Sequence, residues 1–358
     1  MPDFNVEFDR AFTQGISKSA RSFRWAVGGR DAAKVEALGE ALAGSAAPPA
    51  AAVVASSEEG SVVAGSGRVV LSTAGPFSKY SDGIVAACAS AGTSYVDING
   101  EIPWVREVID RDGDAAKRSG AVIVPNCGFD SVPSDLGAFL GFRRSSNLQG
   151  HFKMQGAMSG GTIATGILMA KEANDPAILG GIGIEDPVAP VAPTDARPYW
   201  LAPFGMASIN TRVVRRSARL LDREVRYQEY VVAPSEMVAA KMAKSALTPP
   251  EKIQGMVDAG RLFKPSQGPD AKTRAESWFE LTVVDAAENT PLVVVKGGDP
   301  GYDETAKMVS EAALALVLGD PLGACEGRGG VWTPATAFGD TLVSRLRAAD
   351  MTIEEIPP

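Results

Sequence analysis

Short apolar runs alternate with helical patterns through the first 150 residues of the chain. The runs are continuous, as at Val69-Val70-Leu71, which is typical of strands buried on both faces. Asp31 is a capping signal before one helical pattern, and Gly92 and Gly120 end two others. Strand, helix, strand at this spacing predicts βαβ units and a parallel sheet with helices on both faces. The expected strands cover residues 23–28, 68–73, 94–97 and 121–125, with a short one ending near residue 55, and the expected helices cover 32–43, 82–91 and 103–119.

The second half of the chain has a different pattern. Its β-branched and aromatic runs are separated by long connections instead of regular helices. This arrangement is typical of an antiparallel or mixed sheet in an α+β domain. Residues 187–198 carry four prolines and predict an extended surface loop. The expected strands cover residues 225–233, 277–286 and 291–296, and amphipathic helices are expected at 235–246 and 303–318.

Length and charge narrow the class of protein. The chain has 358 residues, 45% hydrophobic and 22% charged, and can form two cores of ordinary size. Its formal net charge of −8 repels phosphate backbones, so nucleic acid is not an expected partner. No apolar run reaches the ~18 residues of a transmembrane helix, and the N-terminus has no apolar core of a secretory signal.

Cysteine and histidine usage excludes several kinds of site. Cys88, Cys127 and Cys325 are odd in number and have no metal-like spacing, so we expect a reducing compartment, no disulfide framework and no metal site. His151 is the single histidine, and no nucleophile elbow surrounds it. We expect His151 to be a partly exposed strand residue, and Cys127 has no nearby histidine to activate it as a nucleophile.

Ligands of doubly wound sheets bind at the carboxyl ends of the strands. Gly28-Gly29-Arg30 follows the first expected strand, and an arginine there can form a forked contact with a 2′-phosphate, which favours NADP over NAD. The alternative is a surface arginine beside a helix start. The turn Thr73-Ala74-Gly75-Pro76-Phe77 follows the strand at Leu71 and would let a ligand approach the backbone near the pyrophosphate and nicotinamide.

Two further loops end at the same edge of the expected sheet. Ser134 and Asp135 are explained by capping of a helix that runs to about residue 143, but capping does not explain Cys127-Gly128-Phe129-Asp130, which come before it. The second loop is Asp97-Ile98-Asn99-Gly100-Glu101. Glu101 could equally be a general acid or base or cap the following helix, and a structural role is favoured for Asp97.

Together these loops resemble the saccharopine dehydrogenase-like oxidoreductases, especially the branch of trans-acting enoyl reductases. The run Cys127-Gly128-Phe129-Asp130-Ser131-Val132-Pro133-Ser134-Asp135 is the most specific part of the resemblance, which extends from about Arg24 to the C-terminus. The supporting segments are residues 25–30, 75–77, 86–88, 92–97, 100–101, 159–162, 202–204, 209–217 and 329–335.

The resemblance implies an NADP-binding Rossmann domain, a second domain inserted before the last helices, and hydride transfer to an unsaturated carbon or imine, often in lipid metabolism. One departure concerns the glycine-rich phosphate loop with which the family opens. Residues 4–17 hold one glycine, Gly15, and no strand-turn-helix pattern. Because that loop holds the cofactor pyrophosphate, its absence predicts a truncated gene reading or lost cofactor affinity. Residues 56–67 also predict a short crossover helix.

The expected fold is therefore α/β, a Rossmann-like parallel sheet with its first strand and phosphate loop degenerate or missing, and a second α+β domain. We expect a Rossmann-like NADP-binding domain at residues 1–148 with an incomplete N-terminus. An α+β substrate or dimerisation domain is expected at 149–330, and a C-terminal helix at 331–358 is expected to pack back on the first domain.

The predicted function is NADP-dependent reduction of a C=C or C=N bond, and the alternative is a non-catalytic remnant that binds a lipid surface or a protein. An amino-acid dehydrogenase of lysine metabolism would need a charged pocket that the sequence does not locate. Substrate is expected from the side of residues 159–162. We expect a small, lipid-like substrate, a homodimer among the candidate assemblies, and a cytoplasmic location, with association with an organelle, lipid droplet or membrane as the alternative. The expected cofactor-binding residues are Gly29, Arg30, Thr73, Ala74, Gly75, Pro76, Phe77, Cys127, Gly128, Phe129 and Asp130, and the candidate proton donors are Tyr80, Asp130 and Lys153.

Overall fold

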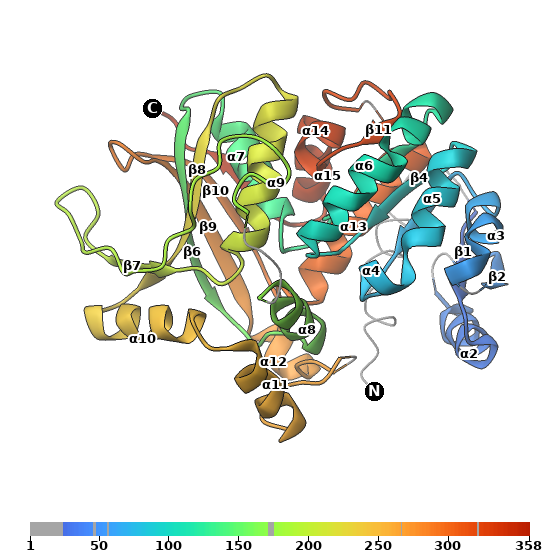
Figure 1. The fold of residues 1–358 in the computed structure, drawn as a ribbon, viewed down its shortest axis with the longest axis horizontal. Helices are drawn as coiled ribbons and strands as arrows, with labels where there is room; N and C mark the ends of the chain where they lie inside the picture. Colours follow the sequence, from blue (N-terminus) through green and yellow to red (C-terminus); the bar gives the residue numbers. More distant parts are fainter. Residues whose placement is uncertain (1–23, 46–47, 56, 171–174, 266, 321) are drawn as a thin grey trace. The chain divides into compact units, whose positions relative to one another are not determined.

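The computed structural model describes residues 24–358 except 46–47, 56, 171–174, 266 and 321 (Figure 1). The chain divides into two compact units. Unit 1 comprises residues 1–99, 104–129 and 302–349, and unit 2 comprises residues 100–103, 130–301 and 350–358. Within unit 1, the described residues start at 24, so the expectation about the phosphate loop at residues 4–17 lies outside the described residues.

Unit 1 contains two parallel sheets among its described residues. Strands β1 (Ala26–Gly29) and β2 (Ala51–Val54) pair with each other. A separate sheet has the order β11-β5-β4-β3, formed by β3 (Val69–Ser72), β4 (Ser94–Asp97), β5 (Val122–Val124) and β11 (Gly330–Val331). All pairings of the second sheet are parallel, so the carboxyl ends of β3, β4 and β5 lie at one edge. The prediction of a parallel Rossmann-like sheet is confirmed.

Local sequence signals begin and end the helices of unit 1. Asp31 caps α2 (Ala32–Leu42) by accepting a hydrogen bond from the backbone N–H of Lys34 at 3.2 Å. Gly92 ends α5 (Asp82–Ala91) with a φ of 80°, a conformation that glycine adopts without steric cost. The predicted helix at 103–119 is α6 (Ile102–Ser119). The short elements between the strands are the 3-10 turn η1 (Ser57–Glu59), α3 (Gly60–Gly65) and α4 (Phe77–Tyr80).

A helix from the end of the chain completes the core of unit 1. The predicted amphipathic helix is α13 (Asp303–Leu318), which packs on β3 and β4 and ends at Gly319 in the left-handed conformation. Its residues Met308, Val309, Ala312 and Leu314 are buried. Two more helices, α14 (Pro334–Phe338) and α15 (Asp340–Ala348), pack against it. The guanidinium of Arg345 on α15 joins Glu311 and Asp320, each at 2.7 Å.

Unit 2 is built on one mixed sheet of the order β12-β10-β9-β6-β8-β7. Strands β6 (Asn147–Gln155) and β8 (Arg226–Ala233) are parallel, and the other neighbours are antiparallel. The remaining strands are β7 (Trp200–Pro203), β9 (Trp278–Asp285), β10 (Pro291–Gly297) and β12 (Thr352–Glu355). The prediction of a mixed sheet in the second half is confirmed.

Helices α7 (Val132–Gly141) and α9 (Ala207–Leu220) pack on each other, α7 also contacts β9 and β10, and α9 contacts β8. Close approach is possible because Gly137 and Gly141 have no side chain; a Cβ on Gly137 would lie 3.0 Å from Val283. The expected helix at 235–246 is α10 (Glu236–Ala246), capped by Ser235. The other helices of unit 2 are α8 (Gly160–Met169), α11 (Pro250–Asp258) and α12 (Ala271–Ala275).

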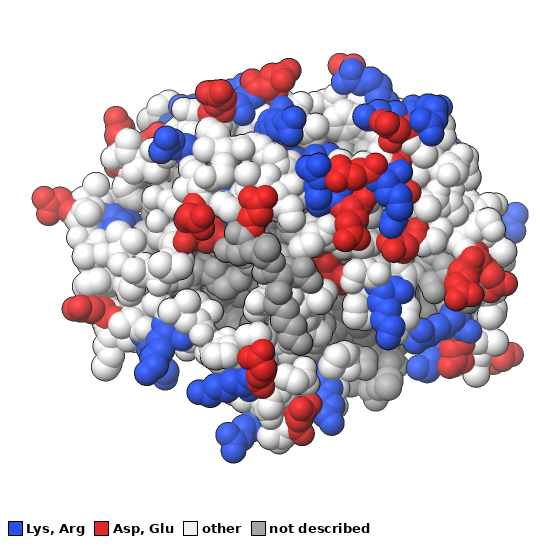
Figure 2. All heavy atoms as spheres, in the orientation of Figure 1, with Lys and Arg blue, Asp and Glu red and all other residues white. Residues whose placement is uncertain are grey.

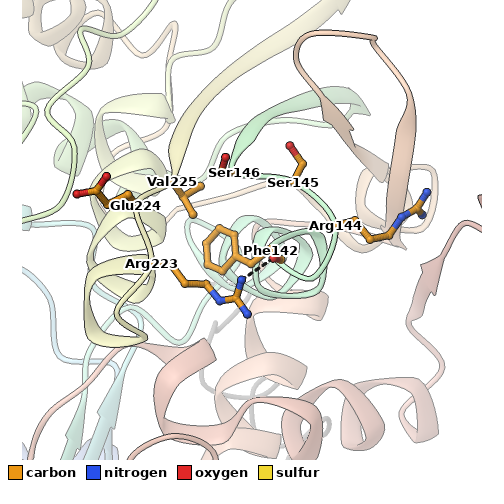
Figure 3. Close-up of a pocket in the computed structure, with 7 residues that line it drawn as sticks. All are labelled: Phe142, Arg144, Ser145, Ser146, Arg223, Glu224 and Val225. Carbon is orange, nitrogen blue, oxygen red and sulfur yellow. Dashed lines mark hydrogen bonds between the residues drawn. The ribbon is translucent and has the colours of Figure 1, made fainter.

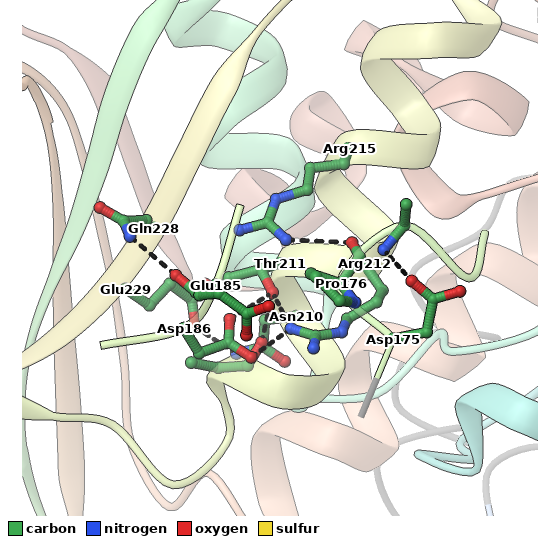
Figure 4. Close-up of polar contacts among 12 residues, drawn as sticks. Asp175, Pro176, Glu185, Asp186, Asn210, Thr211, Arg212, Arg215, Gln228 and Glu229 are labelled. Carbon is green, nitrogen blue, oxygen red and sulfur yellow. Dashed lines mark hydrogen bonds and ion pairs between the residues drawn. The ribbon is translucent and has the colours of Figure 1, made fainter. Parts of the chain in front are cut away.

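Two buried arginines on α9 have polar partners inside unit 2 (Figure 4). Arg212, whose side chain is 2% exposed, forms an ion pair with Asp186. Arg215 donates to the backbone carbonyl of Tyr227 at 2.8 Å and to that of Pro176 at 3.1 Å. Desolvation raises the pKa of buried Glu229 to about 7, although the side-chain amide of Asn210 donates to its carboxylate at 2.9 Å. These contacts fix the loop at 175–186 to α9 and β8.

The distribution of surface charge and the polarity of the helices were also compared with the expectations. On the face drawn in Figure 2, basic and acidic side chains are interspersed without a broad field of one sign. Among the described residues, no helix has both the length and the apolar character needed to cross a bilayer.

Candidate active site

The turn after β3 leaves its backbone accessible at the carboxyl edge of the sheet. Ala74, Gly75 and Pro76 are exposed, and the Gly75–Pro76 peptide bond is cis. The turn is closed by a hydrogen bond from the Gly75 N–H to the Thr73 carbonyl at 3.0 Å. Phe77 differs from its neighbours because it is buried, with its ring 6.1 Å from the ring of Trp104. A ligand can therefore approach the backbone of residues 73–76, and the Phe77 side chain belongs to the core.

The loops after β4 and β5 are joined at a buried carboxylate. Asp97 Oδ1 accepts hydrogen bonds from the Asn99 N–H at 3.0 Å, the Asn99 side-chain amide at 2.7 Å and the Asn126 N–H at 3.0 Å. The Asn126 side chain donates in turn to the Asn99 carbonyl at 2.6 Å. Asn126 has a φ of 64°, and asparagine is one of the few residues that adopt this conformation readily. Asp97 therefore has a structural role, as the sequence indicated.

Burial makes the charge of Asp97 costly. Desolvation raises the pKa of its carboxyl from 3.8 to about 6, and the hydrogen bonds from Asn99 and Asn126 oppose the rise. The second oxygen, Oδ2, has no hydrogen-bond partner of good geometry among the described residues, although the Tyr95 hydroxyl is near enough to favour the charged form. The carboxylate is held by donors at one oxygen only.

The segment Cys127-Gly128-Phe129 is part of the core of unit 1. All three residues are buried, and the Cys127 thiol donates to the Val124 carbonyl at 3.3 Å. The Phe129 N–H donates to the hydroxyl of Thr305 on α13 at 3.1 Å. A Cβ on Gly128 would lie 3.2 Å from Thr305 and 3.3 Å from Ile98. Packing against α13 therefore accounts for the glycine and for the backbone donor.

Arg30 and Tyr80 meet beyond the carboxyl end of β1. The Arg30 guanidinium lies 4.8 Å from the centroid of the Tyr80 ring. Lys79, which the sequence did not single out, lies 5.2 Å from the same centroid. Gly29 precedes this cluster, and a Cβ there would lie 3.0 Å from Val35. Residues that could bind the anionic end of a nucleotide are therefore present in unit 1.

Asp130 belongs to unit 2 and lies beside helices α8 and α9. Its Oδ2 is 3.2 Å from the position that a Cβ on Gly100 would take, and Thr165 and Ile209 line the same position at 3.1 and 3.0 Å. Desolvation alone raises the pKa of the carboxyl from 3.8 to about 7. The residue keeps part of its surface exposed, and it has no hydrogen-bond partner among the described residues.

The other candidate proton donor and the single histidine lie elsewhere in unit 2. Lys153 is exposed on β6 and forms an ion pair with Glu280 at 3.2 Å. His151 is on β6 as expected, but the expectation of partial exposure is wrong because the residue is 1% exposed. Its ring nitrogens contact the Tyr199 hydroxyl and the Gln149 side chain, and desolvation lowers its pKa to about 3.

The expected capping by Ser134 and Asp135 is also wrong. Helix α7 begins after Ser131, so both residues lie inside its first turn. Asp135 instead accepts a hydrogen bond from the hydroxyl of Ser217 on α9 at 2.5 Å. This contact joins two packed helices, which a local capping signal could not reveal. Ser159, in the segment from whose side the sequence predicts substrate entry, caps α8 by accepting from the Thr162 N–H at 3.1 Å.

A hollow of about 320 Å³ on unit 2 is lined by Phe142, Arg144, Arg223 and Val225, among others (Figure 3). Arg223 donates to the Phe142 carbonyl at 2.9 Å, and Arg144 donates to the Ile356 carbonyl at 2.5 Å. Both guanidinium groups donate to backbone carbonyls of the protein itself, so we assign no ligand-binding role to the hollow. In the described part of the chain, no group of three His, Cys, Asp or Glu side chains could hold a metal ion.

Comparison with known proteins identifies the family. Residues 10–124 match the saccharopine dehydrogenase NADP binding domain. A Mycobacterium tuberculosis homologue of the trans-acting enoyl reductases is 32% identical over 95% of this chain and 92% of its own length. The trans-acting enoyl reductase of Mycobacterium leprae is 31% identical over 81% of each chain. A meso-DAP dehydrogenase variant from Clostridium tetani covers 96% of each chain at 12% identity, with a TM-score of 0.46. The predicted resemblance and the predicted cofactor NADP are confirmed, and the chain belongs to the trans-acting enoyl reductase family of NADP-dependent, saccharopine dehydrogenase-like oxidoreductases.

Proposed function

We propose that this protein reduces the C=C bond of an enoyl group, using NADPH as the hydride donor. The nicotinamide, when bound, would supply the hydride to the β-carbon and be oxidised to NADP⁺. The electron pair of the double bond would move toward the acyl carbonyl, and the protein would add a proton at the α-carbon, so that a C–C single bond replaces the double bond. The acyl group makes the substrate lipid-like, as the enoyl reductase relatives suggest.

The hydrogen bonds to the Asp97 carboxylate support this proposal. They hold the loops after β4 and β5 together at the edge of the sheet where β3 also ends. In doubly wound sheets this edge binds the cofactor. The exposed backbone of Thr73 to Pro76 would contact the cofactor beside it, and Arg30 would bind the phosphate of its adenosine half.

Packing limits the roles of the remaining expected cofactor residues. Phe77, Cys127, Gly128 and Phe129 have buried side chains or close core contacts. They would shape the floor of the cofactor site and keep the loops rigid, and we assign them no direct hydrogen bond to the cofactor. Redox chemistry is supplied by the nicotinamide when it is bound, while these residues orient it and exclude water.

Among the three candidate proton donors, Asp130 has the carboxyl chemistry that best suits this role. Its carboxyl has no competing hydrogen bond among the described residues, and because its pKa is raised to about 7 it is protonated in about half of the molecules at neutral pH. Lys153 is exposed and paired with a carboxylate. Tyr80 lies beside Arg30 and Lys79 in unit 1, and these two cations favour its deprotonated form. Neither alternative combines a free proton with a desolvated site.

The test uses NADPH deuterated at both C4 positions and a 2-dodecenoyl thioester of N-acetylcysteamine, with mass spectrometry of the product. We expect one deuterium at the β-carbon and one solvent proton at the α-carbon. Recovery of unlabelled substrate, in the presence of demonstrated NADPH binding, would contradict enoyl reduction. A wild-type protein that binds no NADPH and floats with lipid vesicles would instead support the non-catalytic, lipid-binding alternative.

The role of Asp130 is tested with Asp130→Asn in the same assay. The amide cannot deliver the proton, so we expect turnover to fall about 10²- to 10⁴-fold with unchanged NADPH affinity. Wild-type activity should fall as the pH rises above about 7, because the carboxyl then loses its proton. Asp114→Asn is the matched control, since Asp114 is 81% exposed on α6. Equal turnover of Asp130→Asn and this control would exclude Asp130 as the donor.

A further inference from the structure

Three side chains meet where β1 and α4 of unit 1 come together. The Arg30 guanidinium and the Lys79 ammonium lie 4.8 and 5.2 Å from the centroid of the Tyr80 ring. Arg30 and Lys79 are exposed, and Tyr80 is half-buried. Arg30 directly follows β1, while Lys79 and Tyr80 end the short helix that follows the Gly75–Pro76 turn. Two segments separated by some fifty residues therefore present their polar ends to one point.

Neither cation has an acidic ion-pair partner in the part of the chain that the structure describes. Among the described residues, no carboxylate forms an ion pair with Arg30 or Lys79. Asp31, the nearest acid in sequence, points its side chain at the first turn of α2 and accepts from the Lys34 N–H. Two like charges at one ring repel each other, and this chain has a net charge of −8. Two cations that are unpaired among the described residues favour the approach of an anion.

The chemistry of the cluster fits a phosphate attached to an aromatic base. A guanidinium offers two parallel donors to phosphate oxygens, and an ammonium adds a third donor as a point charge. The Tyr80 ring provides a flat surface beside both. Arg30 and Lys79 also lower the pKa of the Tyr80 hydroxyl, so the phenol is a good donor to a phosphate oxygen. Inorganic anions would use only the cations, whereas a nucleotide would use the ring as well.

We propose that Lys79 and Tyr80 complete, with Arg30, a subsite for the adenosine 2′-phosphate and set the preference for NADPH over NADH. This inference rests on the proposed function. The ammonium of Lys79 binds the phosphate from the α4 side, Arg30 binds it from the β1 side, and the Tyr80 ring contacts the adenosine. Lys79 and Tyr80 would thus help to recognise the 2′-phosphate, although they lie on a different segment from Arg30.

The test measures binding alone and needs no substrate. Adenosine 2′-monophosphate, adenosine 5′-monophosphate, NADPH and NADH are titrated into the full chain by calorimetry at low salt. The variants are Lys79→Ala, Tyr80→Ala and Tyr80→Phe, and the control is Lys117→Ala. Lys117 is an exposed lysine of α6 whose stem lies near Gly330, at the start of β11, so its loss changes the net charge equally at the other edge of the sheet.

We expect Lys79→Ala to weaken adenosine 2′-monophosphate and NADPH about tenfold, with NADH and adenosine 5′-monophosphate unchanged. Tyr80→Ala should weaken all adenosine ligands, while Tyr80→Phe keeps the ring and should retain most NADH affinity. If wild type binds NADPH but Lys79→Ala behaves like Lys117→Ala, the inference is wrong and the proposed function stands. A wild-type protein that binds neither NADPH nor adenosine 2′-monophosphate would overturn both.

Discussion

Replacing Asp97 by asparagine separates the charge of this residue from its hydrogen bonds. All three donors that reach Asp97 contact Oδ1, and none of good geometry reaches Oδ2. An asparagine in the same position can place its carbonyl oxygen at Oδ1 and its amide nitrogen at Oδ2. The variant therefore keeps the three hydrogen bonds that join the loops and loses the buried charge. Asp97→Ala loses both.

The raised pKa of Asp97 determines the size and sign of the expected change in the free energy of unfolding. A folded pKa of about 6 against an ordinary value of 3.8 means that ionisation costs the folded state about 3 kcal/mol at neutral pH. Because the folded pKa is the higher one, this cost is complete above pH 6 and disappears as the pH falls toward 3.8. Neutral hydrogen bonds are weaker than charge-assisted ones, so we expect Asp97→Asn to be about 1–3 kcal/mol more stable than wild type at pH 8.

Thermal unfolding at pH 8, 6 and 5 measures this difference. A gain of 1 kcal/mol raises the melting temperature of a domain of this size by about 2–4 °C. Relative to wild type, the gain of Asp97→Asn should shrink as the pH is lowered. Asp97→Ala removes the same titrating group and should therefore be about 3 kcal/mol less stable than Asp97→Asn at every pH, because three buried donors lose their acceptor. Hydrogen exchange at the Asn99 and Asn126 amides should be slow in Asp97→Asn and fast in Asp97→Ala. If Asp97→Asn melts as low as Asp97→Ala at pH 8, the ionised form is needed and the reasoning is refuted.

Two further substitutions test the packing of each unit. Gly60→Ala should destabilise unit 1 by about 1–3 kcal/mol, because its Cβ would lie 2.2 Å from the Gly83 carbonyl oxygen, whereas Gly65→Ala on the same helix meets no atom within 4 Å and should be neutral in urea unfolding. Arg212→Ala should cost unit 2 about 3 kcal/mol, because Asp186 loses the partner that neutralises it; an unfolding midpoint equal to that of wild type would show that this ion pair contributes nothing.

Local signals in the sequence explain which elements could be predicted. The Asp31 cap and the Gly92 terminus act within one helical turn, so their positions were predictable. Strand β6 was harder to recognise because its polar and apolar residues are mixed and Gly150 interrupts them. A Cβ at Gly150 would lie 2.7 Å from the Tyr227 hydroxyl, so the glycine is set by a neighbouring strand. Helix α9 buries Arg212 and Arg215, and their partners lie in a distant loop and strand.

The candidate site shows the same division between local and distant causes. Strand ends and turns indicated Arg30 and Gly75 because both follow apolar runs. Lys79 was missed because Arg30, the second cation at the ring of the neighbouring Tyr80, lies on another segment, which only the fold brings beside it. Asn126 could have been found from its place after a strand, since asparagine favours the left-handed conformation it adopts. The residues that surround Asp130, which lie on α8 and α9, have no signal in its own loop.

Calorimetric titration of the full chain with NADPH and NADH measures the cofactor preference. We expect NADPH to bind at least about tenfold more tightly than NADH, because only NADPH carries the phosphate that Arg30 and Lys79 can bind. Equal affinities for the two cofactors, or no heat of binding up to millimolar NADPH, would contradict this expectation.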